Sequence, residues 1–171
     1  MVTQGAAGMA ANGPVFRGVT HVALDAKGRL AIPARYRDAL IATGDEAAAG
    51  ESGDRALVLT VDPSGCLLLY PRAAWEPIQA RLMNLSSFNE PIRRLQRLRV
   101  GPADDVDLDA AGRVLVSPGL RQYAGLDHRV VLVGQGNKFE IWDEQRWREQ
   151  TAQAISFAGA ELPPELDGFS L

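Results

Sequence analysis

Two short segments place an aspartate, a glycine and an arginine at the same spacing. They read DAKGR from Asp25 and DAAGR from Asp109. An aspartate at the start of a turn accepts backbone N–H bonds, and a glycine three residues later allows positive φ. The guanidinium that follows can pair with phosphate or with guanine O6 and N7, or it can simply pair with the aspartate across the turn. Turn formation explains the repeated Asp and Gly but does not demand Arg twice, so the repetition favours a binding role for Arg29 and Arg113.

Further basic residues cluster around the first of these turns. Lys27 lies in the turn itself, where a side chain projects from the tip of a hairpin. A two-stranded ribbon fits the DNA major groove, which is about 12 Å wide. The alternative is that these residues are solvated strand positions. We predict DNA contact by one set of basic residues: Arg17, Lys27, Arg29, Arg35, Arg37 and Arg113. A second set is predicted to form the turns: Asp25, Gly28, Asp109 and Gly112.

The segment NEPIRRLQRLRV is predicted to be a helix, with Asn89 as its cap and Pro91 in its first turn. Ile92, Leu95 and Leu98 would form an apolar stripe on that helix. The arginines at positions 93, 94, 97 and 99 are interpreted as a solvated face, in preference to phosphate contacts. Such a face could also contact the acidic second half of another subunit.

Catalytic and metal-binding chemistry finds little support. His21 and His128 have no Cys or His partner at metal-ligand spacing, and no nucleophile-elbow, P-loop or dinucleotide-binding motif occurs. The run from Asp105 to Val116 fails as a calcium loop, because Ala110 replaces the required glycine and Val116 replaces the bidentate glutamate. We therefore expect neither an enzyme nor a protein with a metal, a cofactor or a small-molecule ligand.

The elements that must position the two turns also occur twice. With a constant offset of 84 positions, VALDAKGRLAIPARYRDAL from Val22 matches VDLDAAGRVLVSPGLRQYA from Val106. A second block matches at an offset of 72, so the first copy holds 12 extra residues, which we place in the acidic stretch 43–56. Each copy is predicted to contain a hairpin, a short polar helix, a strand pair and a Trp-bearing helix. The turns of the strand pairs are placed at 62–65 and 134–137.

The repeat predicts a mainly β fold with short helices, an α+β class, in which two hairpin units pair about a pseudo-twofold axis. One copy alone is too small to bury a core. The predicted organisation is a disordered extension at 1–14, a first unit at 15–85, a basic linking helix at 86–99, a second unit at 100–157 and a tail at 158–171.

The charge is distributed unevenly between the halves. The formal net charge is −3, but residues 16–99 hold 12 basic and 9 acidic residues, whereas 100–171 hold 6 and 12. A basic surface is therefore possible on the first copy. No apolar run is long enough for a membrane span, and the one cysteine, Cys66, is expected to be buried in a strand. This profile suits a reducing cytoplasm.

Long motifs resemble the MraZ family of bacterial regulators between Phe16 and Trp147. They are FRGVTHVALDAKGRLAIPARYR, CLLLYP, RRLQRL and VGQGNKFEIWDEQRW. The resemblance implies tandem swapped-hairpin domains of the AbrB and SpoVT type, each with a DxxxR motif whose arginine contacts DNA. Members usually begin with Met directly before the Phe-Arg-Gly found here at Phe16, so residues 1–14 could reflect a start codon assigned too far upstream.

The resemblance also implies a function. Family members assemble as rings, bind repeated boxes in the promoter of their own division and cell-wall gene cluster, and repress it. We therefore expect a nucleoid-associated repressor whose partners are double-stranded promoter DNA and further copies of itself. The alternative is an antitoxin-like or scaffolding module without operator-specific binding. Acidic neighbours at Asp104, Asp105 and Asp107 make the second turn the poorer DNA site, so Arg29 is the preferred reader.

Overall fold

The repeated sequence blocks fold into matching sets of elements in a computed structural model, which describes residues 15–41, 57–155 and 163–166. The first copy contributes β1 (Phe16–Ala23), β2 (Arg29–Ala31), α1 (Ala34–Ile41), β3 (Leu57–Val61), β4 (Leu67–Pro71) and α2 (Arg72–Met83). The acidic stretch 43–56 lies outside the described residues, as do 1–14 and most of the tail.

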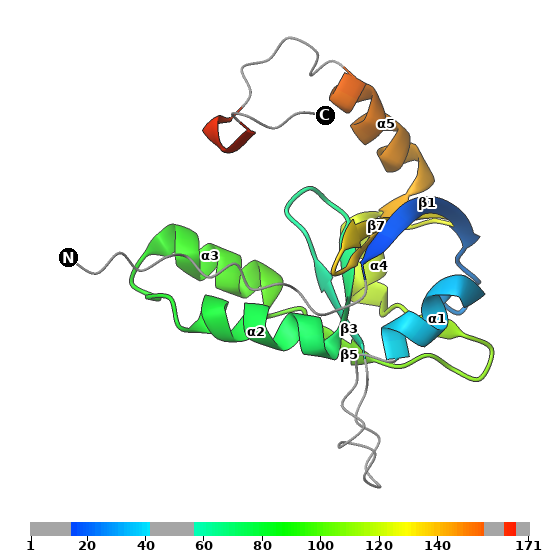
Figure 1. Cartoon of the computed structure of the whole chain (residues 1–171), viewed down its shortest axis with the longest axis horizontal. Coiled ribbons are helices and arrows are strands. Elements are labelled where there is room, and N and C mark those ends of the chain that lie inside the picture. The colour runs from blue at the N-terminus through cyan, green and yellow to red at the C-terminus, as the bar shows by residue number, and fades with distance from the viewer. Residues whose placement is uncertain (1–14, 42–56, 156–162, 167–171) are drawn as a thin grey trace, which may run out of the picture.

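The second copy repeats this order after one linking helix, α3 (Glu90–Arg99). The Asn89 side chain caps α3, and Ile92, Leu95 and Leu98 are half-buried, as their spacing predicts. The elements that follow are β5 (Asp104–Val106), β6 (Arg113–Leu115), α4 (Pro118–Ala124), β7 (Arg129–Gly136), β8 (Phe139–Asp143), α5 (Glu144–Ile155) and a 3₁₀ turn, η2 (Pro164–Leu166). In Figure 1, α2 and α3 lie side by side and extend away from the sheet.

The strands of the two copies interlock. Six antiparallel strands form one sheet in the order β1-β7-β8-β4-β3-β5, and β2 pairs with β6 in a second sheet. β1 therefore pairs with β7 of the other copy, and β5 pairs with β3 in the same way. This exchange gives the pseudo-twofold arrangement of α+β units that the repeat predicts.

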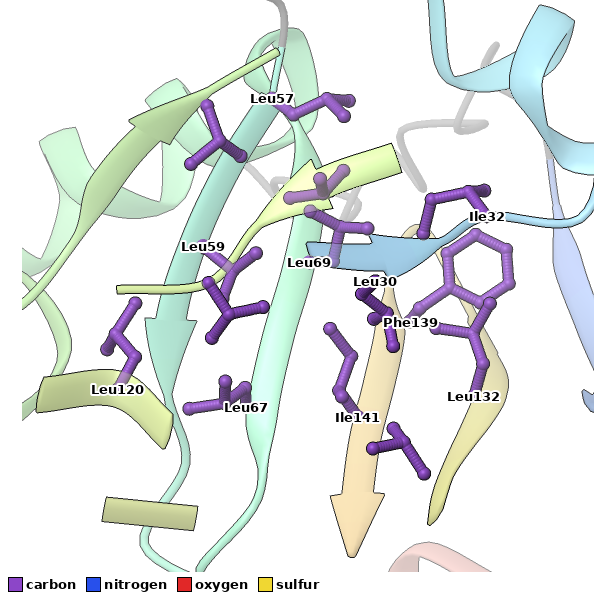
Figure 2. Close-up of a cluster of buried hydrophobic side chains, with 14 of the residues drawn as sticks. Leu30, Ile32, Leu57, Leu59, Leu67, Leu69, Leu120, Leu132, Phe139 and Ile141 are labelled. Atoms are coloured by element: carbon purple, nitrogen blue, oxygen red, sulfur yellow. The ribbon is translucent and has the colours of Figure 1, made fainter. Parts of the chain in front are cut away.

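Side chains from both copies form one shared hydrophobic core. Figure 2 shows Leu30 from β2 and Ile32, just after β2, meeting Leu69, Phe139 and Ile141 from β4 and β8. All five side chains are fully buried. A second apolar cluster, which includes Trp75 and Trp142, covers the other face of the large sheet. Burying a side chain of this size stabilises a fold by about 1.5–3 kcal/mol, so the shared core holds both copies together.

Two local expectations differ from the structure. The hairpin around Asp25 keeps only one bridge, Leu24 to Leu30, because β1 and β2 find their main partners in the other copy. The turn expected at 134–137 lies at 137–138, because β7 continues to Gly136 in order to pair with Phe16. Long-range pairing therefore overrides the turn signal of the glycines. No helix among the described residues is long and apolar enough to cross a membrane.

Candidate nucleic-acid interface

The first turn is fixed by hydrogen bonds to a single carboxylate. Asp25 Oδ1 accepts the backbone N–H groups of Lys27 and Arg29, each at 2.9 Å. The Gly28 N–H donates to the Asp25 carbonyl at 3.0 Å, and Gly28 has φ +80°. In the second turn Asp109 Oδ1 accepts the backbone N–H groups of Ala111 and Arg113, and Gly112 has φ +74°. Asp25, Gly28, Asp109 and Gly112 are therefore seen forming the turns.

Each motif also contains an ion pair. Arg29 Nε lies 2.7 Å from Asp25 Oδ2, and Arg113 Nε lies 2.9 Å from Asp109 Oδ2. The N–H of the arginine backbone, helped by this guanidinium, lowers the pKa of Asp25 and that of Asp109 below the ordinary value. The pairing across the turn, weighed above as the alternative, is thus present. A guanidinium has five N–H donors and the turn takes only Nε–H, so a fixed arginine can still bind a further acceptor.

The two turns lie side by side on the pseudo-twofold axis. β2 and β6 place Leu30 opposite Val114, and Arg113 Nη1 lies 3.9 Å from Asp25 Oδ2. The Ile32 N–H donates to the Gly112 carbonyl at 3.0 Å, and the Val116 N–H donates to the Gly28 carbonyl at 2.8 Å. Arg29 and Arg113 consequently belong to one continuous surface.

Arg37 differs from the other predicted DNA contacts because it lies against the opposite turn. Its Nε donates to the Ile32 carbonyl at 2.8 Å, and a Cβ added to Gly112 would lie 2.1 Å from that nitrogen. Arg121 occupies the equivalent place over Gly28, where an added Cβ would lie 2.8 Å from its Cζ. Each of these two half-buried arginines therefore packs against the turn of the other copy. Their recurrence at the 84-position offset was the available signal for this shared role.

Three exposed basic residues are specific to the first copy. Lys27 lies in the turn, and Arg17 lies on β1. Arg35 donates to Thr20 Oγ1 at 2.6 Å, and its Cζ lies 4.6 Å from the centre of the Tyr36 ring. The Tyr36 hydroxyl donates to the Arg17 carbonyl at 2.9 Å. Tyr36 therefore joins α1 to β1 and brings Arg17 and Arg35 to the same face.

The second copy lacks this basic surface. At the positions equivalent to Arg17, Lys27 and Arg35 it has Gly101, Ala111 and Gly119. A mostly apolar hollow of about 560 Å³, lined in part by Gly101 and Gly119, occupies this region. We call it the α4 hollow and define it by its main apolar lining residues, Val61, Leu98, Pro102, Leu120 and Tyr123.

Three arginines of α3 form ion pairs with nearby carboxylates. Arg94 and Arg93 lie 2.8 and 3.9 Å from Glu90 on the same helix, as a solvated face would. Arg99 pairs with Asp62 at 2.7 Å and ties the end of α3 to the β3–β4 turn. Within the described residues, no group of His, Cys, Asp and Glu side chains could hold a metal ion.

Comparison with known proteins agrees with this repeated architecture. A family model described as "MraZ protein, putative antitoxin-like" matches residues 15–98 and again 100–162. This chain belongs to the MraZ family. A transcriptional regulator MraZ from Thiobacillus denitrificans is 55% identical over 157 residues, which cover 92% of this chain and all of the relative. The MraZ regulator of Methylobacillus flagellatus is equally similar, and that of Pseudomonas syringae pv. syringae is 50% identical over 89% of the chain and 97% of its own length. These relatives are named as regulators and not as enzymes.

Proposed function

We propose that this MraZ-family protein is a DNA-binding transcriptional regulator that grips DNA mainly through its first copy. The main support is that the two copies share the same turn and strand arrangement but differ in the exposed charge that they carry. Lys27 in the first turn, Arg17 on β1 and Arg35 on α1 add three exposed cations to the first copy, and their equivalents in the second copy carry no charge. Charged residues that the fold does not require in both copies are the ones best explained by a ligand.

The residues divide into two roles. Lys27, Arg17 and Arg35 contact phosphates, which supply most of the affinity and fix the register of the protein on DNA. Arg29 reads a base edge, because its ion pair with Asp25 holds the guanidinium in one orientation and reduces the freedom lost on binding. Arg113 lies beside Asp25 on the same surface and contributes less, since acidic residues surround its own turn. Arg37 acts through the opposite turn and not through DNA.

The target and the assembly form a finer part of the proposal. The protein represses its own division and cell-wall gene cluster in the cytoplasm by binding repeated promoter boxes as a ring. A single basic turn offers few contacts, so one subunit binds weakly. Several subunits held together raise the effective concentration at each further box, and the overall affinity rises without new contacts.

A gel-shift experiment tests this function. DNA from upstream of the protein's own gene is the probe, and a scrambled fragment of equal length and composition is the control. Retardation of the upstream fragment at protein concentrations that leave the scrambled one free supports the regulator. Equal retardation of both, or none at low salt, contradicts it and favours the antitoxin-like or scaffolding module. A salt titration adds a second reading, because affinity should fall by about 0.9 log units per log unit of salt for each phosphate contacted.

A further inference from the structure

The last residue of α2 and the loop that joins α2 to α3 expose three large apolar side chains. Met83, Leu85 and Phe88 are 54%, 46% and 97% accessible to solvent. We call this group the α2–α3 tip; it lies at the outer end of the two helices in Figure 1. Gln96 fixes the loop through hydrogen bonds to the carbonyls of Leu82 and Leu85, at 2.8 and 3.2 Å. A phenylalanine held in water on an ordered element marks a contact surface better than a scattered apolar residue does.

The α4 hollow offers a matching apolar surface. In the first copy the same region is filled, because a Cβ added to Gly18 would lie only 3.0 Å from the Tyr36 hydroxyl. In the second copy Leu120 stands at the position of Tyr36 and Gly119 at that of Arg35. A Cβ added to Gly119 meets no atom within 4 Å. The smaller side chains therefore leave an opening of a size that takes an aromatic ring.

The tip and the hollow cannot meet within one subunit. Phe88 precedes the first turn of α3, and Leu98 lines the hollow from its last turn. Ten helical residues separate these ends by about 15 Å. A contact between them must join two subunits.

The charges around the two surfaces are complementary. Arg81, Arg93 and Arg94 flank the tip, with Glu90 as the acidic residue among them. The hollow adjoins a second depression through Ser117, and that depression is lined by Asp104, Asp107 and the exposed Leu115. Arg97 is the basic residue on the rim of the hollow. The tip is thus apolar with mostly basic residues beside it, and the hollow is apolar with two aspartates in the adjoining depression.

We propose that the α2–α3 tip of one subunit inserts Phe88 into the α4 hollow of the next subunit. The two surfaces differ, so the contact is head-to-tail and leaves a free tip at one end and a free hollow at the other. Such contacts build rings when the rotation between subunits closes. This contact would build the ring of the proposed function. The role of the ring rests on that proposed function, whereas the contact itself does not.

Two substitutions test the contact from its two sides. Phe88→Asp places a charge on the tip without disturbing the core, since that side chain is exposed. Gly119→Trp fills the hollow from a helix position with open space around its Cβ. Ser87→Asp and Gly119→Ala are the matched controls. Mass is measured by light scattering and native mass spectrometry without DNA, and melting curves verify folding. We expect an oligomer for the wild type and both controls, and a monomer for each test variant.

Mixing the two variants makes the test specific for a head-to-tail contact. Phe88→Asp keeps an intact hollow and Gly119→Trp keeps an intact tip, so an equimolar mixture should form a one-to-one heterodimer that stops growing there. A monomeric wild type, a wild-type mass for Gly119→Trp, or a mixture that stays monomeric overturns the proposal. If the hollow instead holds DNA, a small ligand or part of its own subunit, Gly119→Trp should keep the wild-type mass. The gel shift is read separately, so an assembled protein that ignores its promoter would refute the regulator and leave this contact standing.

Discussion

The two copies of the repeat share a scaffold and differ in the surface that the scaffold carries. Both have the Asp-Gly-Arg turn, the ion pair inside it and an arginine that covers the opposite turn glycine. Only the first has exposed cations at all three flanking positions, Arg17, Lys27 and Arg35. The second has glycine, alanine and an apolar hollow in their place.

This difference separates structural residues from binding residues. The residues that both copies share contact either their own turn or the opposite one. The exchange of strands about the pseudo-twofold axis therefore explains why both copies have them. What one copy alone carries needs another explanation. Repetition of Arg29 as Arg113 is therefore weaker support for DNA contact than the presence of Lys27 in a single copy.

Removing the unequal surface should have the largest effect. The variant Arg17→Ala, Lys27→Ala, Arg35→Ala loses up to three phosphate contacts. The salt slope of operator binding should fall by about 2.7, which corresponds to a loss of about several hundredfold in affinity at moderate salt. Fluorescence anisotropy with promoter DNA at several salt concentrations measures both quantities.

The matched control removes the same charge elsewhere. Arg81→Ala, Arg93→Ala, Arg94→Ala takes three exposed arginines from α2 and α3. Because these arginines also flank the α2–α3 tip, both triple variants are compared on a fragment with a single box, for which the affinity of this control should change little. If both triple variants lose the same affinity, only net charge matters and the first copy has no special surface.

The shared scaffold should be equally sensitive in both halves. Gly28→Ala and Gly112→Ala each force a side chain into positive φ and against an arginine of the other copy. Strain of this kind costs about 1–3 kcal/mol, so each variant should lose that much free energy of unfolding in urea. Gly119→Ala, at a helical position with free space, should be neutral or slightly stabilising. A large cost in only one half would show that the turns are not equivalent.

The smallest predicted effect is a dependence of stability on acid pH. The pKa of Asp25 and that of Asp109 are lowered in the folded protein, chiefly by the backbone N–H of Arg29 and Arg113. Their contribution is complete above the unfolded pKa of about 4 and is lost as the pH falls through the folded pKa. Asp25→Asn and Asp109→Asn should each remove an equal part of the acid sensitivity seen in urea midpoints between about pH 5 and 2. Asp127→Asn, in an exposed loop, is the control, and a change confined to one turn would contradict the equivalence.

Local signals in the sequence predicted most elements of the fold. The repeated blocks predicted the two turns and the strand pairs, and the Asn89 cap predicted the start of α3. The pairing of β1 with β7 was not readable from local patterns, because it joins residues more than a hundred positions apart. The family resemblance supplied that exchange.

The same reason limited the prediction of the site. The excess of basic residues in the first copy, Arg17, Lys27 and Arg35 among them, follows from charge counting, whereas the position of Arg37 over Gly112 depends on the interlocked copies. The exposure of Phe88 was not foreseen either, since an aromatic residue in a short linker gives no sign of whether it is buried.

The comparison of Arg29→Ala with Arg113→Ala tests the central claim most directly. Each variant loses the ion pair within its own turn, and Arg113→Ala loses in addition only the 3.9 Å contact with Asp25. The two variants should therefore unfold at similar urea concentrations and keep the same oligomeric mass. Loss of a bidentate base contact costs about 1–3 kcal/mol, and Arg29→Ala should therefore weaken operator binding about 5- to 150-fold at fixed salt. Arg113→Ala should weaken it by a clearly smaller factor. Equal losses, or a larger loss for Arg113→Ala, would contradict the assignment of DNA reading to the first copy.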